Sequence, residues 1–324
     1  MLAVIEIQAW HWMAFVLAIL FFLALDLGVF HRKGHVVTFK EAMGWTTLWF
    51  VMAMLFAGGL ARWFGKQEAT EFVTGYIIEL SLSMDNVFVI ALIFSYFRVP
   101  NEYQHRVLFW GIMGALLMRG VMIGAGAALV QHFSWVLYLF GAFLVVTGIK
   151  MLFADEEGVH PEKNPLIKLA KKFFPVTTVF DGQKFFTLEN GKRALTPLAI
   201  VLLMVETTDL IFALDSIPAI FAITTKPFIV FTSNVFAILG LRSLYFVLAG
   251  AIQYFRYLKY GLALVLAFVG VKMLIDPHDH APQWFQAKIP TNLSLLIVVG
   301  IIVVAVLLSF IAARGEAKEK TDAK

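Results

Sequence analysis

Residues 195–223 read LTPLAIVLLMVETTDLIFALDSIPAIFAI. This stretch is long and apolar enough to cross a bilayer as a helix, which takes about 20 mostly apolar residues. It nevertheless carries three carboxylates, Glu206, Asp209 and Asp215. Each carboxylate costs roughly 2.5–3.5 kcal/mol at the centre of a membrane helix. We therefore expect this helix to lie inside a bundle, with its acids facing protein partners, water or an ion.

The whole chain has the composition of a membrane protein. Of its 324 residues, 60% are hydrophobic and 15% are charged, against about 25% charged in soluble domains. We predict an all-α polytopic membrane bundle of about nine transmembrane helices. The apolar runs that predict them are 9–30, 45–64, 72–97, 107–130, 133–153, 195–223, 228–252, 258–275 and 292–313. The composition excludes an ordinary soluble enzyme and a nucleic-acid-binding protein, and the lack of cysteine excludes disulfides and thiolate metal sites.

The placement of lysine and arginine predicts the orientation of the bundle. With the N-terminus outside, the inside loops and the tail hold 18 basic residues, and the outside loops hold 4. We therefore predict an outside N-terminus and a cytoplasmic C-terminus. This bias also accounts for the sequence pI near 9.1 without a nucleic-acid partner.

One long loop, 154–194, lies on the predicted cytoplasmic side. Residues 165–174 (PLIKLAKKFF) predict a short amphipathic helix on the membrane surface. Asp181-Gly182 and Asn190-Gly191 are turn signals on either side of FFTL, so we expect a small hairpin there. The loop is interpreted either as a linker between two halves of the protein or as a regulatory module.

The stretches on either side of this loop are similar to each other. GIKML at 148–152 matches GVKML at 270–274, and Arg119 and Arg242 each lie in the middle of a span. The 34 residues from Asp85 to Arg119 match the 33 residues from Asp209 to Arg242. Spans 3–5 and 6–8 thus predict two three-helix repeats, and the predicted orientation inverts one relative to the other. Inverted repeats are typical of secondary transporters, although an old duplication kept only for packing is the alternative.

This repeat predicts the organisation of the chain. We expect two N-terminal transmembrane helices, a first repeat, the cytoplasmic loop, a second repeat, and a last segment with the outside loop, the final helix and the tail. The corresponding ranges are 1–71, 72–153, 154–194, 195–275 and 276–324.

Ionisable and polar side chains inside the predicted spans are the candidate functional residues. Six carboxylates fall there: Asp26, Glu79, Asp85, Glu206, Asp209 and Asp215. The spacing of Glu79, Ser83 and Asn86 places them on one helix face, and Glu206, Asp209 and Ser216 share another. Pro218 follows Asp215 closely, and we expect it to kink or break its helix and free the carbonyl of Leu214 for an ion.

These residues offer hard oxygen ligands. Carboxylates, the amides of Asn86 and Asn234 and several hydroxyls suit Mg²⁺, Ca²⁺ or Mn²⁺ rather than Zn²⁺ or Cu⁺. Six acids against Arg119 and Arg242 leave a formal charge of −4 inside the membrane. A divalent cation would offset part of that charge and protonation the rest, which favours a proton-coupled cation transporter.

Several of these residues also have structural interpretations. We expect Arg119 and Arg242 to pair with midplane carboxylates and tie the repeats together, and Glu79 and Glu206 to be either metal ligands or members of those ion pairs. Asp26 lies near the inner end of the first span and is expected to be structural.

Two features near the span ends are expected to lie in contact with water. Lys150 and Lys272 are expected to extend from the ends of their spans to the membrane surface. The string DPHDH at 276–280 has metal-binding residue types, but we expect it to be a solvated loop.

Two strings resemble signature segments of the TerC family of bacterial inner-membrane proteins, SMDNVFVIALIFSYFRVP at 83–100 and VETTDLIFALDSIPAIFAITTKPFIVFTSN at 205–234. The continuation FAILGLRSLYF at 236–246 and the closing GVKMLI are similar to the Alx branch of that family in particular. The resemblance implies manganese efflux for that branch and, by the family name, tellurium resistance. It implies one acidic motif of Glu79, Asp85 and Asn86, and a second of Glu206, Asp209 and Asp215.

The function predicted from residues and resemblance together is export of divalent metal, with Mn²⁺ as the substrate, in exchange for protons. The alternative is a membrane component of a metal-delivery or tellurium- and stress-resistance complex. We expect no enzyme activity and no prosthetic group. The expected partners are the substrate ion, the lipid bilayer, and either further copies of the chain or other membrane proteins.

Overall fold

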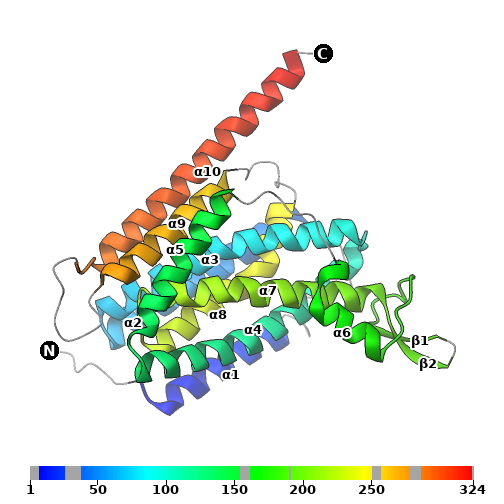
Figure 1. Cartoon of the computed structure of the whole chain (residues 1–324), viewed down its shortest axis with the longest axis horizontal. Coiled ribbons are helices and arrows are strands. Elements are labelled where there is room, and N and C mark those ends of the chain that lie inside the picture. The colour runs from blue at the N-terminus through cyan, green and yellow to red at the C-terminus, as the bar shows by residue number, and fades with distance from the viewer. Residues whose placement is uncertain are drawn as a thin grey trace.

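The computed structural model shows a bundle of long helices with one small hairpin (Figure 1). It describes residues 7–25, 38–153, 161–189, 191–249, 257–276 and 286–322. The helices are α1 Ala9–Leu25, α2 Phe39–Trp63, α3 Lys66–Tyr96, α4 Asn101–His132, α5 Val136–Phe153, α6 Pro165–Phe173, α7 Pro197–Phe221, α8 Pro227–Ala249, α9 Leu258–Ile275 and α10 Thr291–Asp322. Eight of these are long and apolar enough to cross a membrane, and α1 is a shorter apolar helix. The prediction of an all-α polytopic membrane bundle is confirmed.

The first predicted span is described only in part. Helix α1 ends at Leu25, whereas the apolar run continues to residue 30. Residues 26–37 lie outside the described residues, and so does the candidate Asp26.

Helix α7 corrects one expectation from the sequence. Thr196 caps its first turn by accepting a hydrogen bond from the amide of Ala199, and Pro197 occupies the first helical position. The helix then continues through Pro218 and ends at Phe221, so of the two predicted outcomes at Pro218, a kink or a break, the break is wrong. Only three residues of the helix follow Pro218. The proline therefore removes one hydrogen bond near the end of a long helix, where packing on its neighbours holds it in place.

The segment before α7 forms the predicted hairpin. Strand β1 (Phe186–Glu189) pairs antiparallel with β2 (Lys192–Leu195), with Phe186 opposite Leu195. Gly191 has a positive φ of 75°, which the turn requires and glycine adopts without strain. We call the end of the bundle that carries α6, β1 and β2 the hairpin end (Figure 1). The opposite end is the one with the α7–α8 connection, residues 222–226.

Helix α6 packs against the bundle rather than standing apart from it. Asn164 caps α6 and also donates a side-chain hydrogen bond to the sulfur of Met204 on α7, at 3.3 Å. Ile167, in the first turn, is buried. The amphipathic helix is confirmed, but its apolar face is partly covered by α7 because Asn164 and Ile167 anchor it there.

Helices α3 and α7 run antiparallel through the middle of the bundle. Glu71, near the start of α3, accepts a hydrogen bond from Thr224, just past the end of α7. A Cβ on Gly75 would lie 3.4 Å from Ile220 near the end of α7. These contacts therefore join the beginning of α3 to the end of α7.

Helices α5 and α9 also cross antiparallel, and they touch through their backbones. A Cβ on Gly148 would lie 2.8 Å from the carbonyl oxygen of Ala263, and a Cβ on Gly270 would lie 2.7 Å from that of Gly141. Aligning Gly148 with Gly270 gives a shift of 122 residues (270 − 148), and the same shift aligns Gly141 with Ala263 (263 − 141). The two contacts are thus reciprocal, as across a two-fold axis. An inverted repeat requires this arrangement; the repeat itself stays a prediction.

This crossing should tolerate no added side chain. We expect Gly270→Ala to lower the free energy of unfolding by about 1–3 kcal/mol, because its methyl group would meet backbone atoms of α5 that cannot move cheaply. Thermal unfolding in detergent measures the effect. The matched control is Gly124→Ala in α4, where nothing lies within 4 Å of a Cβ. Equal stability of the two variants would contradict the close crossing.

Candidate functional site

Arg119 of α4 is the centre of a buried ionic cluster. Its side chain is 2% exposed and bridges α3 and α7. The guanidinium forms an ion pair with Glu79 of α3 through Nη1. It also binds Asp209 of α7 in a bidentate manner, with Nη2 donating to Oδ1 at 2.9 Å and Nε donating to Oδ2 at 3.2 Å. One cation therefore holds two carboxylates from two antiparallel helices, which confirms the expected pairing of Arg119.

Neutral polar groups surround these three charges. Asn86 donates from Nδ2 to Asp209 Oδ1 at 2.7 Å. Ser216 Oγ and Asn234 Oδ1 each accept from Arg119 Nη1 at 3.4 Å. All six side chains are buried. We call this set, Glu79, Asn86, Arg119, Asp209, Ser216 and Asn234, the central cluster.

The central cluster has unused acceptor capacity. Its formal charge is −1, from two carboxylates and one guanidinium. Glu79 Oε2 and Asn86 Oδ1 are buried oxygens with no hydrogen-bond partner in the described part of the chain. Asn234 Nδ2 is a buried donor that likewise has no partner among the described residues. Buried polar atoms without partners are rare in folded proteins. The two oxygens could therefore accept a proton donor or a cation.

The other predicted acids lie around the cluster rather than in it. Glu206 is half-buried one turn before Asp209, and its carboxylate fills the space that a side chain at Gly114 of α4 would take. Asp215 accepts a hydrogen bond from Thr147 of α5. Asp85 is half-buried and sits about 100° around the helix from Asn86.

The described residues hold no group of three His, Asp or Glu side chains close enough to bind a metal. The metal-ligand roles of Glu79, Asp85, Asn86, Glu206, Asp209 and Asp215 therefore stay predictions.

The cluster brings together one carboxylate from each acidic motif. Glu79 of the first motif and Asp209 of the second share Arg119. The two motifs also share a spacing, because six residues separate Glu79 from Asp85 and six separate Asp209 from Asp215. A polar residue, Asn86 or Ser216, follows each motif. This common spacing was a signal available in the sequence.

A second ionic group at the opposite end of the bundle was not foreseen. Lys226 donates to Glu68 Oε1 at 2.7 Å and pairs with Glu71 Oε2 at 3.3 Å, and Thr224 donates to Glu71 at 2.7 Å. Burial opposes the charge on Lys226, but its hydrogen bond to Glu68 and the charge of Glu71 raise the pKa of Lys226. The group joins α3 to the α7–α8 connection.

Lys272 differs from its predicted position. It is 3% exposed and donates to the carbonyl oxygen of Ala222 at 2.6 Å, so the expectation that it extends to the membrane surface is wrong. The acceptors that hold it are this carbonyl and Asp276, 3.8 Å away. Lys150, its counterpart, is exposed. Of the string DPHDH, residues 277–280 lie outside the described residues.

Removing the central guanidinium should be strongly destabilising. We expect Arg119→Gln to lower the free energy of unfolding by about 3–5 kcal/mol, because Glu79 and Asp209 would be left as uncompensated buried charges. Thermal unfolding in detergent measures the loss. The control is Lys184→Gln, which breaks the exposed pair with Asp181 and should leave the unfolding temperature almost unchanged. An equally small change for Arg119→Gln would contradict the central role of this ion pair.

Comparison of the sequence with known proteins shows the family of the chain. Residues 64–317 match the integral membrane protein TerC family. An uncharacterized membrane protein of Myxococcus xanthus is 50% identical over 312 residues, covering 96% of this chain and 95% of that protein. Alx of Escherichia coli, named as a candidate membrane-bound redox modulator, is 44% identical over 307 residues, covering 92% of this chain and 93% of its own. No solved structure matches. The chain is a multi-pass integral membrane protein and belongs to the TerC family, with Alx among its relatives.

Proposed function

We propose that this protein is a secondary transporter that exports divalent metal ions, with Mn²⁺ as its substrate, in exchange for protons. The observation that carries the proposal is the central cluster. It is an oxygen-rich group of buried side chains within apolar helices, and it keeps a net negative charge and two unpartnered oxygens. Buried ionisable groups of this kind mark ion pathways in membrane proteins.

The donor chemistry supports a hard divalent cation. Glu79, Asp209, Asn86, Ser216 and Asn234 all offer oxygen atoms, which suit Mg²⁺, Ca²⁺ and Mn²⁺. The choice of Mn²⁺, and of export, rests on the resemblance to the Alx branch. The two half-buried acids nearby, Glu206 and Asp215, would supply further ligands or carry the exchanged protons.

Arg119 has a defined part in this proposal. In the conformation described, it occupies the space between Glu79 and Asp209 that a shared metal ion would need. Arg119 then acts as a tethered cation that holds the two carboxylates together when no metal is bound. A divalent ion competes for the same carboxylates, and a loaded site requires the guanidinium to withdraw from at least one of them.

The antiparallel crossings of α3 with α7 and of α5 with α9 support alternating access. If the two three-helix units form an inverted repeat, the central cluster lies at their interface, where transporters of this kind bind their substrates. The family and its bacterial relatives support placement in the inner membrane. The bias of basic residues supports an outside N-terminus and a cytoplasmic hairpin end.

Transport in proteoliposomes tests the proposal. We expect Mn²⁺ flux driven by a pH gradient, and we expect Asp209→Asn to reduce it at least about tenfold because one carboxylate of the cluster is neutralised. Asp181→Asn, which removes a carboxylate beside the hairpin, is the matched control and should keep the flux. Absence of Mn²⁺ flux in the unmodified protein, under gradients of either direction, would refute the proposal.

A membrane partner protein is the second candidate function, and one observation favours it. The segment of α6, β1 and β2 exposes apolar side chains, among them Phe173, Val179 and Leu188, each more than 70% exposed. Such a patch suits contact with a partner protein or with lipid. In this alternative the protein assists a metal-delivery or tellurium- and stress-resistance complex.

Replacement of residues 165–189 by a neutral flexible linker separates the two functions. The transporter predicts that purified protein with this replacement keeps Mn²⁺ flux, provided that it remains folded. The partner function predicts that cells lose metal or tellurite resistance with this replacement while they keep it with Asp209→Asn. The transporter is supported if the protein with the linker keeps its Mn²⁺ flux and cells with Asp209→Asn lose their resistance.

A further inference from the structure

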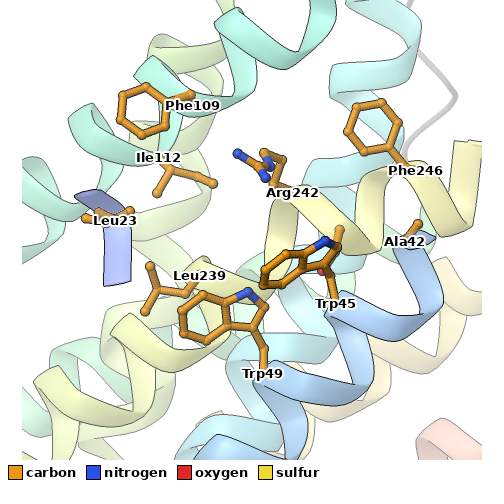
Figure 2. A pocket seen from close by; sticks show the side chains of 10 residues that line it. Leu23, Ala42, Trp45, Trp49, Phe109, Ile112, Leu239, Arg242 and Phe246 are labelled. Atoms are coloured by element: carbon orange, nitrogen blue, oxygen red, sulfur yellow. The ribbon is translucent and has the colours of Figure 1, made fainter. Parts of the chain in front are cut away.

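A hollow of about 580 Å³ opens at the end of the bundle opposite the hairpin. The start of α3, the α7–α8 connection, the end of α9 and the start of α10 surround it. A cavity inside the bundle is much smaller. Figure 2 shows the one lined by Trp45, Trp49 and Arg242, which holds about 20 Å³, or about one water molecule. The hollow, by contrast, has the volume of a site for a polyatomic ligand.

Four lysines line this hollow, and each comes from a different segment of the chain. Lys66 begins α3, Lys226 lies in the α7–α8 connection, Lys272 is near the end of α9 and Lys288 precedes α10. The loops predicted to lie outside hold only four basic residues, these three loop lysines and Arg62. Basic residues are scarce on that side of a membrane protein. The gathering of three of the four at one hollow therefore indicates a local role.

The acids at the hollow do not neutralise its lysines. Among the described residues they are Glu68, Glu71 and Asp276, so four lysines against three acids leave a formal charge of +1 (4 − 3). Lys226 binds the first two acids, at 2.7 and 3.3 Å. Lys66 and Lys288 have no acidic partner in the described part of the chain. Their charges are therefore available to an anion.

Lys272 adds a buried ammonium group with unused donors. Its side chain is 3% exposed, and it donates one hydrogen bond, to the carbonyl oxygen of Ala222 at 2.6 Å. The carboxylate of Asp276 is 3.8 Å away, which is beyond hydrogen-bond distance. An ammonium group has three donors. Lys150, at the same place in the matching string GIKML, is exposed, so the shared string does not by itself require the burial of Lys272.

Two further features favour an anion in the hollow. Helix α10 begins there, with Thr291 and Asn292 in the wall, and the free amides of a first helical turn carry a positive partial charge. The ends of α7 and α9 bring the opposite partial charge, which the hydrogen bond from Lys272 to Ala222 offsets in part. Lys288 lies close enough to Lys272 for their charges to repel each other. An anion between these two lysines would relieve that repulsion.

We propose that this hollow binds an anionic phosphate group, with Lys66, Lys272 and Lys288 as its cationic contacts. The hollow lies where the candidate spans α3 and α10 begin and α7 and α9 end, which is the depth of lipid headgroups. Basic pockets between membrane helices bind such headgroups. The source that fits is therefore an anionic phospholipid, whereas a free phosphate ion has the same chemistry but leaves most of the volume unfilled. This site does not depend on the proposed cation transport.

Native mass spectrometry of the full chain in detergent tests the site. We would add phosphatidylglycerol or the zwitterionic phosphatidylcholine and measure how many lipids each chain retains. We expect phosphatidylglycerol to be preferred, and Lys66→Gln combined with Lys288→Gln to lower its apparent affinity at least about tenfold. Both lysines are exposed, so this double variant should remain folded, which thermal unfolding checks.

Two control variants separate the charge at the hollow from other effects. Lys66→Arg combined with Lys288→Arg keeps both charges and should keep the preference for phosphatidylglycerol. Arg62→Gln removes the remaining basic residue of the same side, which is exposed and does not line the hollow, and it should change nothing. A preference that persists in the double glutamine variant, or an equal loss with Arg62→Gln, would overturn the site.

Equilibrium dialysis with radiolabelled orthophosphate distinguishes the two sources of the phosphate group. Retention of phosphatidylglycerol that depends on Lys66 and Lys288, without binding of orthophosphate, supports the lipid headgroup. Binding of orthophosphate that depends on the same lysines, without a preference between the two lipids, supports the site but assigns it to a free phosphate. Equal retention of both lipids without binding of orthophosphate would refute the proposal. Absence of Mn²⁺ flux would refute the proposed transport and leave this site unaffected.

Discussion

The ion pairs between Arg119 and the two carboxylates Glu79 and Asp209 set the constraint on which the rest of the bundle depends. Charges in a medium of low dielectric constant are costly unless they are paired. A helix with three acids can cross the membrane because other helices surround it. Helix α7 therefore lies beside α3, α4 and α5, and Arg119 reaches it from α4. The position of the charges determines which helices are central.

Much of this fold follows from the pattern of apolar residues. The long helices, the amphipathic α6 and the hairpin at Phe186–Leu195 are all visible in the sequence because each has a local cause: length, periodicity or a glycine turn. Pro218 shows where local reasoning fails. A proline is expected to break a helix, but near the end of α7 it removes one hydrogen bond, and the neighbouring helices keep the rest in place.

The candidate site was predictable in its residue types and less so in its contacts. Arg119 was expected to pair with midplane carboxylates, and it does. Which carboxylates it meets depends on the register between α3 and α7, which only packing decides, so the sequence did not single out Glu79 and Asp209 as its partners. Lys272 was misplaced for a similar reason. Its acceptor, the carbonyl of Ala222, lies in the α7–α8 connection, 50 residues earlier in the chain. Nothing in the sequence around Lys272 indicates this contact.

The net charge of −1 on the central cluster has an electrical consequence for the proposed cycle. With one divalent ion bound the cluster becomes +1, and moving an elementary charge across a membrane costs about 2.3 kcal/mol per 100 mV. An inside-negative potential then opposes both the outward movement of the loaded site and the inward return of an empty site at −1. One proton on the returning site makes it neutral, so the potential no longer opposes its return. Two protons bring the returning site to +1, and the potential then assists the return as much as it resists the export. The full cycle becomes electroneutral.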